Sequence, residues 1–411
     1  MTVDILTFGC RLNAYESEVM RVLSAAGDLE ATVVVNTCAV TAEAERQARQ
    51  AIRRVARERP EARIVVTGCA AQIDPASWAA LPNVHRVLGN DDKMRPENWL
   101  PGAGSAVSDI MSARETAAHL VTEFAGRARA FVQVQQGCDH RCTFCVIPFG
   151  RGRNRSVPIG AVADQVRTLV AGGYQEVVLT GVDIASYGPD LPGSPSLGQM
   201  VRRLLLAVPE LPRLRLSSID PAAIDDDLWR LIAEEPRLMP HLHLSLQAGS
   251  DMILKRMRRR HSRGDAMEVV RRARDLRPGI AIGADLIAGF PTETETLFDQ
   301  TLSFVAEAAL PYLHVFPYSE RAGTPAARMP PVPKPVRKQR AAALRDAGRA
   351  EAHRFFTAKI GDMVSILTEA DRSGHTEHFA PVRLALPCAP GQLVTARVTG
   401  ATNDTLLAEA A

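Results

Sequence analysis

Apolar, β-branched runs alternate with helical stretches through the first hundred residues. Three such runs each end in a cysteine, over 3–10, 32–38 and 63–69. Short apolar runs of this length are typical of buried strands. A helix is predicted from Thr41 to Arg59, with Thr41 as its N-cap. Strand–helix–strand alternation predicts an open parallel α/β domain.

The same alternation continues through the middle of the chain. Strand-like runs with helical spacers occur at 131–135, 176–180, 213–217, 241–247, 280–287 and 312–316. Six β/α units of this length predict a parallel TIM-like barrel, complete or partly open. Between the two regions, a Pro-Gly-Ala-Gly-Ser stretch predicts a domain linker over 101–123.

The pattern changes after the proline-rich stretch 330–335. A helical segment over 336–355 is followed by short β-type runs with glycines between them. This pattern predicts a small antiparallel β-barrel of the kind that binds oligonucleotides. The predicted fold class is therefore α/β with three domains. They are an open α/β domain at 1–105, a partial barrel at 124–355 and the small barrel at 356–411.

Composition narrows the function only slightly. The chain has 411 residues, a formal charge of +3 and seven cysteines, an odd number that argues against a disulfide framework. No apolar run approaches the roughly 20 residues that span a bilayer, and no secretory signal is visible, so we expect no membrane association and a cytoplasmic location. Basic patches could meet phosphates or simply be solvated; they lie at 46–59, 151–155, 255–263 and 334–345.

The strongest chemical signal is a cysteine triplet, Cys138, Cys142 and Cys145, which we call the loop cysteines. The triplet follows the first predicted barrel strand, on the face where barrel active sites lie. A four-iron cluster normally takes four thiolates, so three leave one iron open to a small molecule. A zinc knuckle or three buried cysteines are the alternative interpretations.

A second set comprises the cysteines that end the first three strands, Cys10, Cys38 and Cys69, which we call the strand-end cysteines. Carboxyl ends of parallel strands meet at one edge of a sheet, so these thiols are expected to converge on a shared metal site. A single cysteine in such a position is usually a small buried apolar residue. Cys388 stands apart from both sets and is interpreted as structural.

Together these features resemble the methylthiotransferases, a branch of the radical S-adenosylmethionine enzymes. The resemblance covers essentially the whole chain: three separated amino-terminal cysteines, a CxxxCxxC barrel and a carboxyl-terminal TRAM domain. Gly-Cys-Arg-Leu-Asn-Ala-Tyr-Glu-Ser at 9–17 and Asn-Thr-Cys-Ala-Val-Thr at 36–41 are most similar to the branch acting on threonylcarbamoyladenosine in tRNA.

The resemblance implies two [4Fe–4S] clusters and S-adenosylmethionine as cofactors. The loop cysteines would hold the cluster that binds S-adenosylmethionine and cleaves it to a deoxyadenosyl radical. The strand-end cysteines would hold the second cluster, whose open iron carries the sulfur to be methylated and inserted. Both sets would then need to lie near one substrate.

Further cofactor-binding residues follow from the same resemblance. Phe144, just before the last loop cysteine, would lie near the adenine, although a core aromatic also fits there. Thr180 and Gly181 close the second barrel strand, where related enzymes position the methionine amino group. Gln247 and Asp285 are expected to end later strands and face the same mouth, although Asp285 could instead cap a helix or pair with an arginine.

Two groups of residues are candidates for RNA contacts. His375 and Phe379 in the TRAM-like segment could stack on unpaired bases or simply form a turn and a strand. Arg151, Arg153 and Arg155 follow the loop cysteines and are candidates for the phosphates of an anticodon loop.

The predicted activity is insertion of a methylthio group at carbon 2 of N6-threonylcarbamoyladenosine, beside the tRNA anticodon (position 37). Alternative substrates are isopentenyladenosine in tRNA and a ribosomal-protein aspartate. A non-catalytic iron–sulfur or zinc RNA-binding protein is the alternative of another class. The activity also requires a sulfur donor and an electron donor such as a flavodoxin or ferredoxin, and the chain is expected to act as a monomer.

Overall fold

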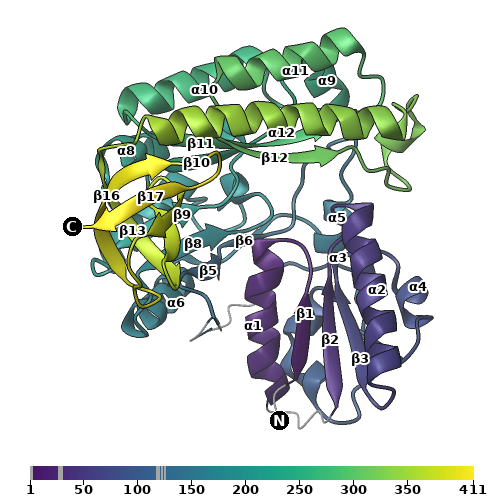
Figure 1. Cartoon of the computed structure of the whole chain (residues 1–411). Helices are drawn as coiled ribbons and strands as arrows, with labels where there is room; N and C mark the ends of the chain where they lie inside the picture. The colour runs from purple at the N-terminus through teal and green to yellow at the C-terminus, as the bar shows by residue number, and fades with distance from the viewer. Residues whose placement is uncertain (1–2, 26–30, 117–120, 122–123, 125) are drawn as a thin grey trace.

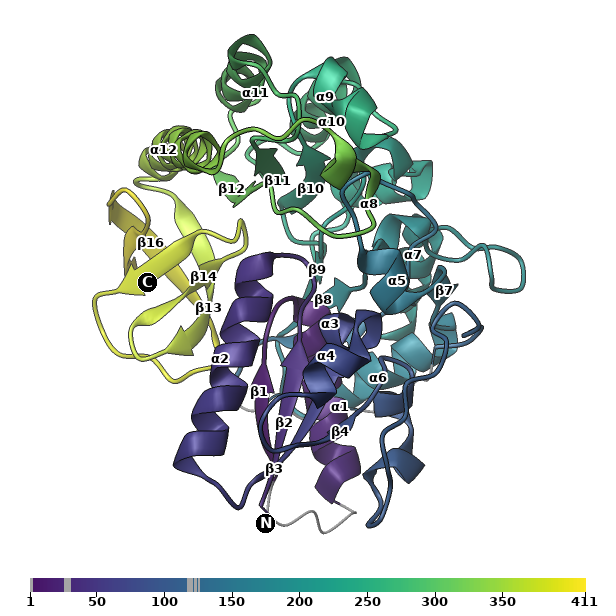
Figure 2. The same ribbon diagram turned by 90° about the vertical axis from the view of Figure 1, so that its right-hand side faces the viewer.

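The computed structural model describes residues 3–25, 31–116, 121, 124 and 126–411. Three bodies of β-structure follow one another along the chain (Figure 1): a purple amino-terminal sheet, a teal and green barrel, and a yellow carboxyl-terminal barrel. The turned view shows the long helix α12 (Lys334–Thr357) beside the last strands of the middle barrel (Figure 2). No helix in these described ranges is both long and apolar enough to cross a membrane.

The amino-terminal sheet has four parallel strands in sequence order. They are β1 (Asp4–Thr7), β2 (Thr32–Thr37), β3 (Arg63–Gly68) and β4 (Val84–Val87). The helices of this region are α1 (Arg11–Ala25), α2 (Ala42–Glu58), α3 (Cys69–Ile73) and α4 (Pro75–Ala79). The predicted open parallel sheet is confirmed, and so is the N-cap of α2, because the Thr41 hydroxyl accepts a hydrogen bond from the Ala44 amide.

The middle barrel contains two parallel sheets of three strands each. They are β5-β8-β9, with β5 (Ala130–Gln133), β8 (Glu176–Thr180) and β9 (Arg213–Leu216), and β10-β11-β12, with β10 (His241–Gln247), β11 (Ala281–Ala288) and β12 (Tyr312–Pro317). A bridge between Ile219 and Leu244 links the two sheets. Because β5 and β12 do not pair with each other within the described chain, the barrel is partly open.

Helices cover the outside of this barrel. They are α6 (Ile159–Ala171), α7 (Leu197–Ala207), α8 (Asp226–Glu234), α10 (Arg263–Leu276) and α11 (Glu295–Glu307). Two shorter helices, α5 (Ile147–Arg151) and α9 (Asp251–Met257), follow strand ends, and a small ribbon pairs β6 (Gln135–Gln136) with β7 (Arg155–Ser156).

Side chains alternate between the helix-packed core and the barrel interior. Leu242, Leu244 and Leu246 of β10 belong to the same apolar core as the surrounding helices. Because successive strand residues point to opposite faces, the intervening positions face inward. Polar side chains at inward positions on β9 to β12 include Arg213, Arg215, His241, His243, Asp285 and His314. Closed barrels of this type fill their interior with branched apolar residues, so polar lining is suited to a ligand.

The carboxyl-terminal body is a closed five-stranded barrel in the order β13-β14-β15-β17-β16. Its strands are β13 (Met363–Ala370), β14 (Ser373–Thr376), β15 (Pro381–Leu384), β16 (Leu393–Ala401) and β17 (Leu406–Ala410). The predicted small barrel is confirmed, but a purely antiparallel barrel is wrong, because β15 and β17 run parallel. Strand direction cannot alternate all the way around a closed ring of odd number, so one parallel pair is required.

Part of the expected linker is attached to the amino-terminal sheet. The Val87 amide donates to Ser105 Oγ, and Ala106 bridges Leu88 at the end of β4. Ser108 in turn donates from both its amide and its hydroxyl to Asp92. The linker positions 117–120, 122 and 123 lie outside the described residues.

Candidate metal and cofactor site

The structure brings the strand-end cysteines together at the carboxyl edge of the amino-terminal sheet. Cys10 follows β1 after two residues, Cys38 follows β2 directly, and Cys69 is the first residue of α3. Each thiol lies within the electrostatic field of the other two. Cys38 and Cys69 are buried, whereas Cys10 is exposed.

Glycine makes this convergence possible. Gly68 has φ +97, in the left-handed region that side chains rarely adopt, and a Cβ there would lie 2.2 Å from the Thr37 carbonyl oxygen. Gly9 has φ +98, and its Cβ would lie 2.7 Å from Cys38 Sγ. The chain can therefore turn at the end of β1 and of β3 only with glycine before the cysteine.

A buried arginine from the middle barrel contacts the strand-end set. Arg151, 1% exposed, donates from Nε to Cys69 Sγ at 3.0 Å. Its terminal nitrogens bond to the Glu16 carboxylate, where the Nη2–Oε2 distance is 2.9 Å, and to Asn13 Oδ1. Asn90 Nδ2 lies 3.7 Å from the same sulfur.

Two buried cations share one buried carboxylate in this network. Lys93 Nζ donates to Glu16 Oε2 at 2.7 Å, and both side chains are fully buried, as is Arg151. Buried charge is costly unless it is paired. Anionic thiolates at Cys69 and Cys10 would balance the second cation, so the residues fit a negatively charged, thiolate-ligated group.

The burial of Arg151 corrects one sequence-based interpretation. Arg151 and Arg155 are 1% and 3% exposed and form hydrogen bonds inside the protein. The prediction that they contact phosphates is therefore wrong. Arginine runs usually mark solvated surface, but these two side chains turn inward to carboxylate, sulfur and carbonyl partners. Arg153, between them, is exposed.

The loop cysteines lie between β6 and α5, at the carboxyl end of the first barrel strands. The Cys145 amide donates to the Cys142 carbonyl at 3.1 Å, which closes the loop. Arg259 Nη1 lies 3.7 Å from Cys142 Sγ, and Cys138 Sγ lies 4.0 Å from Asp183 Oδ2. This carboxylate also accepts hydrogen bonds from Ser186 Oγ at 2.7 Å and His140 Nε2 at 3.1 Å.

Burial controls the protonation of the thiols. It raises the pKa of Cys38 and Cys138 to about 12 and that of Cys145 to about 11. Desolvation by the surrounding protein also raises the pKa of Cys10, although part of this residue is exposed, while Arg151 acts in the opposite direction. Because metals bind thiolate, loading these sites must release protons.

The two cysteine sets meet where α3 packs against α5. A Cβ built on Gly150 of α5 would lie 3.1 Å from Cys69 Cβ, so the two helices are in close contact. The Cys69 thiol also contributes to the raised pKa of Cys145, which belongs to the other set. Both sets therefore face one region between the amino-terminal sheet and the barrel mouth.

The spacing of the sulfurs fits clusters better than single ions. Among the described residues, the group of three His, Cys, Asp or Glu side chains with donor atoms within 4.8 Å of one another is His243, Asp285 and His314. In neither cysteine set do the three sulfur atoms all lie within 4.8 Å of one another. A cluster attaches its thiolates to different irons, whereas a zinc ion needs all its ligands around one atom.

Three of the expected cofactor-binding residues lie around the barrel mouth. Phe144 is partly buried and packs edge to face on Phe290, with ring centroids 6.5 Å apart. Thr180 is buried at the end of β8. Gly181 has no room for a side chain, because a Cβ would lie 2.7 Å from the Gln135 carbonyl oxygen.

Gln247 is the strained residue of this mouth. It ends β10 after an irregularity in the pairing with β11 and has φ +72, which is unusual for a residue with a side chain. Its side-chain amide has no hydrogen-bond partner among the described residues. Strained backbone of this kind is retained where it positions a group for a ligand.

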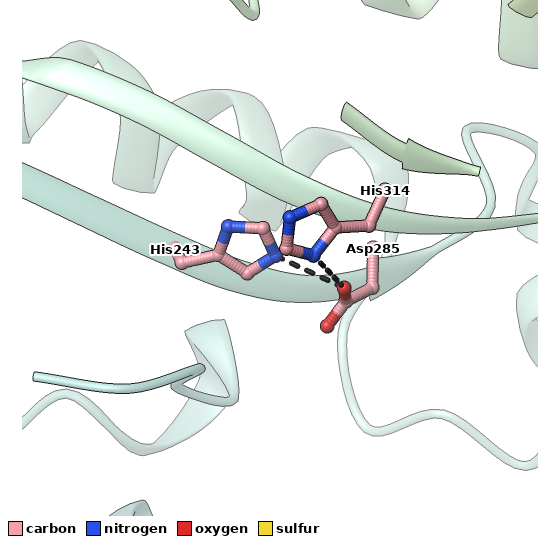
Figure 3. Close-up of side chains that lie close together, drawn as sticks. All are labelled: His243, Asp285 and His314. Atoms are coloured by element: carbon pink, nitrogen blue, oxygen red, sulfur yellow. Dashed lines mark hydrogen bonds and ion pairs between the residues drawn. The ribbon is translucent and has the colours of Figure 1, made fainter. Parts of the chain in front are cut away.

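Asp285 lies elsewhere than the sequence predicted. It is in the middle of β11, where it pairs in register with His314, and the strand continues to Ala288. The prediction that Asp285 ends a strand is therefore wrong, and so are the alternatives that it caps a helix or pairs with an arginine. Figure 3 shows that it accepts hydrogen bonds from His243 Nε2 at 3.0 Å and His314 Nδ1 at 3.2 Å. The two histidines were missed, although polar residues at alternate positions of apolar strands were a signal for them.

The two side chains expected to stack on RNA bases, His375 and Phe379, stack on each other in the structure. The His375 and Phe379 rings stack with centroids 4.7 Å apart. Guanidinium groups of Arg215, Arg129 and Arg11 lie 4.9, 5.2 and 5.8 Å from the Phe379 ring centroid. Phe379 therefore faces the middle barrel and not the outer surface of the small barrel.

Known proteins match this chain over nearly its whole length. The Radical SAM superfamily profile matches residues 132–305, and the profile described as uncharacterized protein family UPF0004 matches residues 2–89. Threonylcarbamoyladenosine tRNA methylthiotransferase MtaB of Rickettsia prowazekii is 52% identical over 97% of this chain and 94% of its own length. The protein of the same name from Bacillus subtilis is 38% identical over 80% of this chain and 76% of its own.

The chain belongs to this methylthiotransferase family. It is accordingly a radical S-adenosylmethionine transferase, and the predicted enzyme class, [4Fe–4S] clusters and S-adenosylmethionine are confirmed as those of the family. A methyltransferase of Kitasatospora setae, TsrM, solved with cobalamin and a [4Fe–4S] cluster, has a similar fold. Its TM-score is 0.54 at 16% identity, over 77% of this chain and 69% of that one.

Proposed function

We propose that this enzyme inserts a methylthio group at carbon 2 of N6-threonylcarbamoyladenosine in tRNA, beside the anticodon. The observation that carries the proposal is the 52% identity over nearly both full lengths to a relative named for this substrate. The meeting of the two cysteine sets at the contact of α3 with α5 supports it, because methylthiolation needs two sites near one base.

The two cysteine sets have different roles in this proposal. The loop cysteines would hold the cluster that, when bound, supplies the electron for radical formation from S-adenosylmethionine. The strand-end cysteines would hold the cluster that carries the sulfur. The positively charged Arg151 contacts the sulfur of Cys69. At the other site, Asp183 lies beside Cys138 and is hydrogen bonded to His140 and Ser186.

S-adenosylmethionine would lie across the barrel mouth. Phe144 offers an apolar wall for the adenine, and the free amide of Gln247 offers a donor and an acceptor for polar groups of the ligand. Thr180 and Gly181 form the strand end at which the methionine amino group would be placed. Gly181 excludes a side chain there, so backbone groups can approach the ligand.

The three predicted domains have separate tasks in the proposal. Residues 1–105 would hold the sulfur site and 124–355 the radical site, while the TRAM-like residues 356–411 would bind the anticodon loop. A flavodoxin or ferredoxin would deliver electrons, a separate donor would supply sulfur, and a cytoplasmic monomer would suffice. Exposed Arg153 beside the loop cysteines is the remaining candidate of its segment for a tRNA phosphate.

The alternative functions have less support. A relative from Staphylococcus epidermidis named tRNA-2-methylthio-N(6)-dimethylallyladenosine synthase is 31% identical over 90% of this chain, below the 52% and 38% of the Rickettsia prowazekii and Bacillus subtilis relatives. The family also disfavours a ribosomal-protein substrate and a non-catalytic iron–sulfur or zinc RNA-binding role.

Mass spectrometry of tRNA nucleosides tests the proposal in cells. A strain lacking the gene should accumulate N6-threonylcarbamoyladenosine without its 2-methylthio derivative, and the intact gene should restore the derivative. A gene encoding Cys138→Ala should not restore it. Persistence of the methylthio derivative in the deletion strain would contradict the proposed substrate.

A further inference from the structure

Arg11 connects the charged interior of the middle barrel with the sulfur site. Arg11 begins α1, directly after Cys10, and its guanidinium lies 5.8 Å from the ring centroid of Phe379, which also contacts Arg215 and His241 of the barrel. Arg129, Arg215 and Asp285 of the barrel are its charged neighbours. A residue adjacent in sequence to a strand-end cysteine thus extends into the polar interior.

Arg11 differs from the other arginines around it in having no carboxylate partner. Arg129 Nε and Arg215 Nε lie 2.8 and 2.9 Å from Glu176 Oε1, and Arg129 also pairs with Glu369. Arg11 forms no ion pair with any carboxylate in the described parts of the chain. Asp285 influences it electrostatically but lies beyond ion-pair distance.

The surroundings of Arg11 favour an anion. The guanidinium groups of Arg11, Arg129 and Arg215 lie 5.8, 5.2 and 4.9 Å from the Phe379 ring centroid, so Arg11 lies among other positive charges. A guanidinium remains charged in proteins. An incoming carboxylate would relieve this repulsion and could form two parallel hydrogen bonds with the guanidinium.

The cluster of His243, Asp285 and His314 supplies imidazole and carboxylate hydrogen-bonding groups in the same barrel interior (Figure 3). Both imidazoles donate to Asp285 Oδ1, which fixes the orientation of each ring. The second carboxylate oxygen has no partner among the described residues, and the His314 side chain is 59% exposed. The cluster therefore presents an acceptor and an accessible imidazole edge, and Asp285 lies within the electrostatic range of the unpaired Arg11.

We propose that Arg11, with the His243–Asp285–His314 cluster, forms a subsite that binds the threonyl part of the substrate base, with Arg11 pairing with its carboxylate. This inference rests on the proposed function, since the threonylcarbamoyl group is what carries a carboxylate, a hydroxyl and N–H groups. Asp285 accepts from the hydroxyl or an N–H, and His314 contacts the hydroxyl. The subsite lies beside Cys10, which places the adenine of the same nucleoside next to the sulfur site.

The proposed subsite explains discrimination between related bases. An isopentenyl group carries no charge, so it would leave Arg11 and Asp285 desolvated without new partners. Sites that are built to pair with a polar group reject analogues lacking it, because their own polar groups remain unpaired. A base with the carboxylate should therefore bind in preference to one without it.

The test combines a change in the protein with a change in the ligand. Full-length reconstituted enzyme is titrated with fluorescent anticodon hairpins that carry adenosine, N6-threonylcarbamoyladenosine or the methyl ester of the latter. The ester removes the carboxylate charge and little else. Esterification should weaken binding to the wild type about tenfold, and should not weaken binding to Arg11→Gln, which has already lost the pairing. Arg11→Lys should retain part of the preference.

Matched variants separate this pairing from general effects. Arg57→Gln removes an exposed charge from α2 and should keep the tenfold effect of esterification. His314→Gln should reduce the preference for the threonylcarbamoyl hairpin over plain adenosine several-fold. Iron content is measured for every variant, so that loss of binding is compared only between equally loaded proteins; if Arg11→Gln loads poorly, Arg11→Met, which also lacks the charge, takes its place.

The outcomes distinguish the subsite from the function. If wild type methylthiolates the hairpin but esterification weakens wild type and Arg11→Gln equally, the subsite is wrong and the function stands. If wild type neither modifies nor prefers the threonylcarbamoyl hairpin, both fail. A stoichiometric divalent metal other than iron that disappears in His314→Gln would make the histidine cluster a metal site and would overturn its role in the subsite.

Discussion

The Nε atom of Arg151 lies 3.0 Å from the sulfur of Cys69, although the two residues are 82 positions apart in the chain. This contact joins the middle barrel to the sulfur site of the amino-terminal sheet. It places a buried positive charge against a proposed cluster ligand, whose negative charge would otherwise be poorly solvated. Arg151 is therefore a positioning residue for the strand-end site.

Replacing Arg151 tests this relationship through metal content. Arg151→Met keeps the apolar stem of the side chain but removes the charge, so the strand-end cluster should load poorly while the loop cluster loads normally. Iron should fall from about eight to about four atoms per chain. Arg153→Met, an exposed neighbour, is the matched control and should retain the wild-type iron content. Equal iron in both variants would contradict the role of Arg151.

Glu16 should be a major contributor to stability. Glu16→Gln would leave Arg151 and Lys93 buried without their carboxylate, at a cost of roughly 3–5 kcal/mol. Denaturant unfolding of the metal-free protein measures this loss. Glu43→Gln removes an exposed ion pair with Arg46 on α2 and should cost far less. Removing the second charge in Glu16→Gln/Lys93→Met should recover part of the loss, and the absence of any recovery would argue against charge imbalance as the cause.

Gly68 should tolerate no side chain. In Gly68→Ala the new methyl group would meet the Thr37 carbonyl oxygen as well as an unfavourable φ, so both stability and loading of the strand-end site should fall. Gly102 also has positive φ but open space around it, so Gly102→Ala isolates the backbone effect at about 1 kcal/mol. Thermal unfolding should show the Gly68 variant to be clearly less stable, and equal effects would mean that the contact with Thr37 can relax.

Acid should weaken the structure through Glu176. Burial alone would raise the pKa of this carboxyl, but the charges of Arg215 and Arg129 and a hydrogen bond from Arg215 lower it from 4.5 to about 2. A pKa that is lower in the folded state stabilises the protein above the unfolded value, and this stabilisation is lost as pH falls from about 4.5 toward 2. The expected loss between pH 6 and pH 3 is roughly 2 kcal/mol from this group.

Urea unfolding across this pH range checks the prediction. Glu176→Gln should be less stable at pH 6 and should lack this part of the pH dependence. Glu58→Gln removes an exposed carboxylate and serves as the control. If the pH dependence of the stability of Glu176→Gln matched that of the wild type, Glu176 would not be a cause of the loss of stability in acid.

Strands of the barrel were predictable because their apolar runs are short, regular and bounded by glycine or polar residues. The runs at 176–180 and 241–247 match β8 and β10 in both bounds. The same strand pattern also identifies the strand ends, so the convergence of the strand-end cysteines could be predicted. Local pattern determines these features, so sequence alone was sufficient.

Partners of buried charges were not predictable in the same way. Arg151 was interpreted as an RNA contact because a run of arginines usually faces solvent, yet its Glu16 partner lies 135 positions away. Asp285 was placed at a strand end, but its hydrogen-bond partners His243 and His314 come from neighbouring strands. Such pairings depend on tertiary register, which no local pattern contains.

The central claim is that the two cysteine sets do different work on one tRNA base. The most direct measurement is mass spectrometry of products from reconstituted enzyme, S-adenosylmethionine, sulfide, a reductant and a threonylcarbamoyladenosine hairpin. Wild type should release deoxyadenosine and yield the 2-methylthio base. Cys69→Ala should still cleave S-adenosylmethionine but yield no methylthio base, whereas Cys138→Ala should do neither. Normal methylthiolation by Cys69→Ala, or S-adenosylmethionine cleavage by Cys138→Ala, would contradict the account.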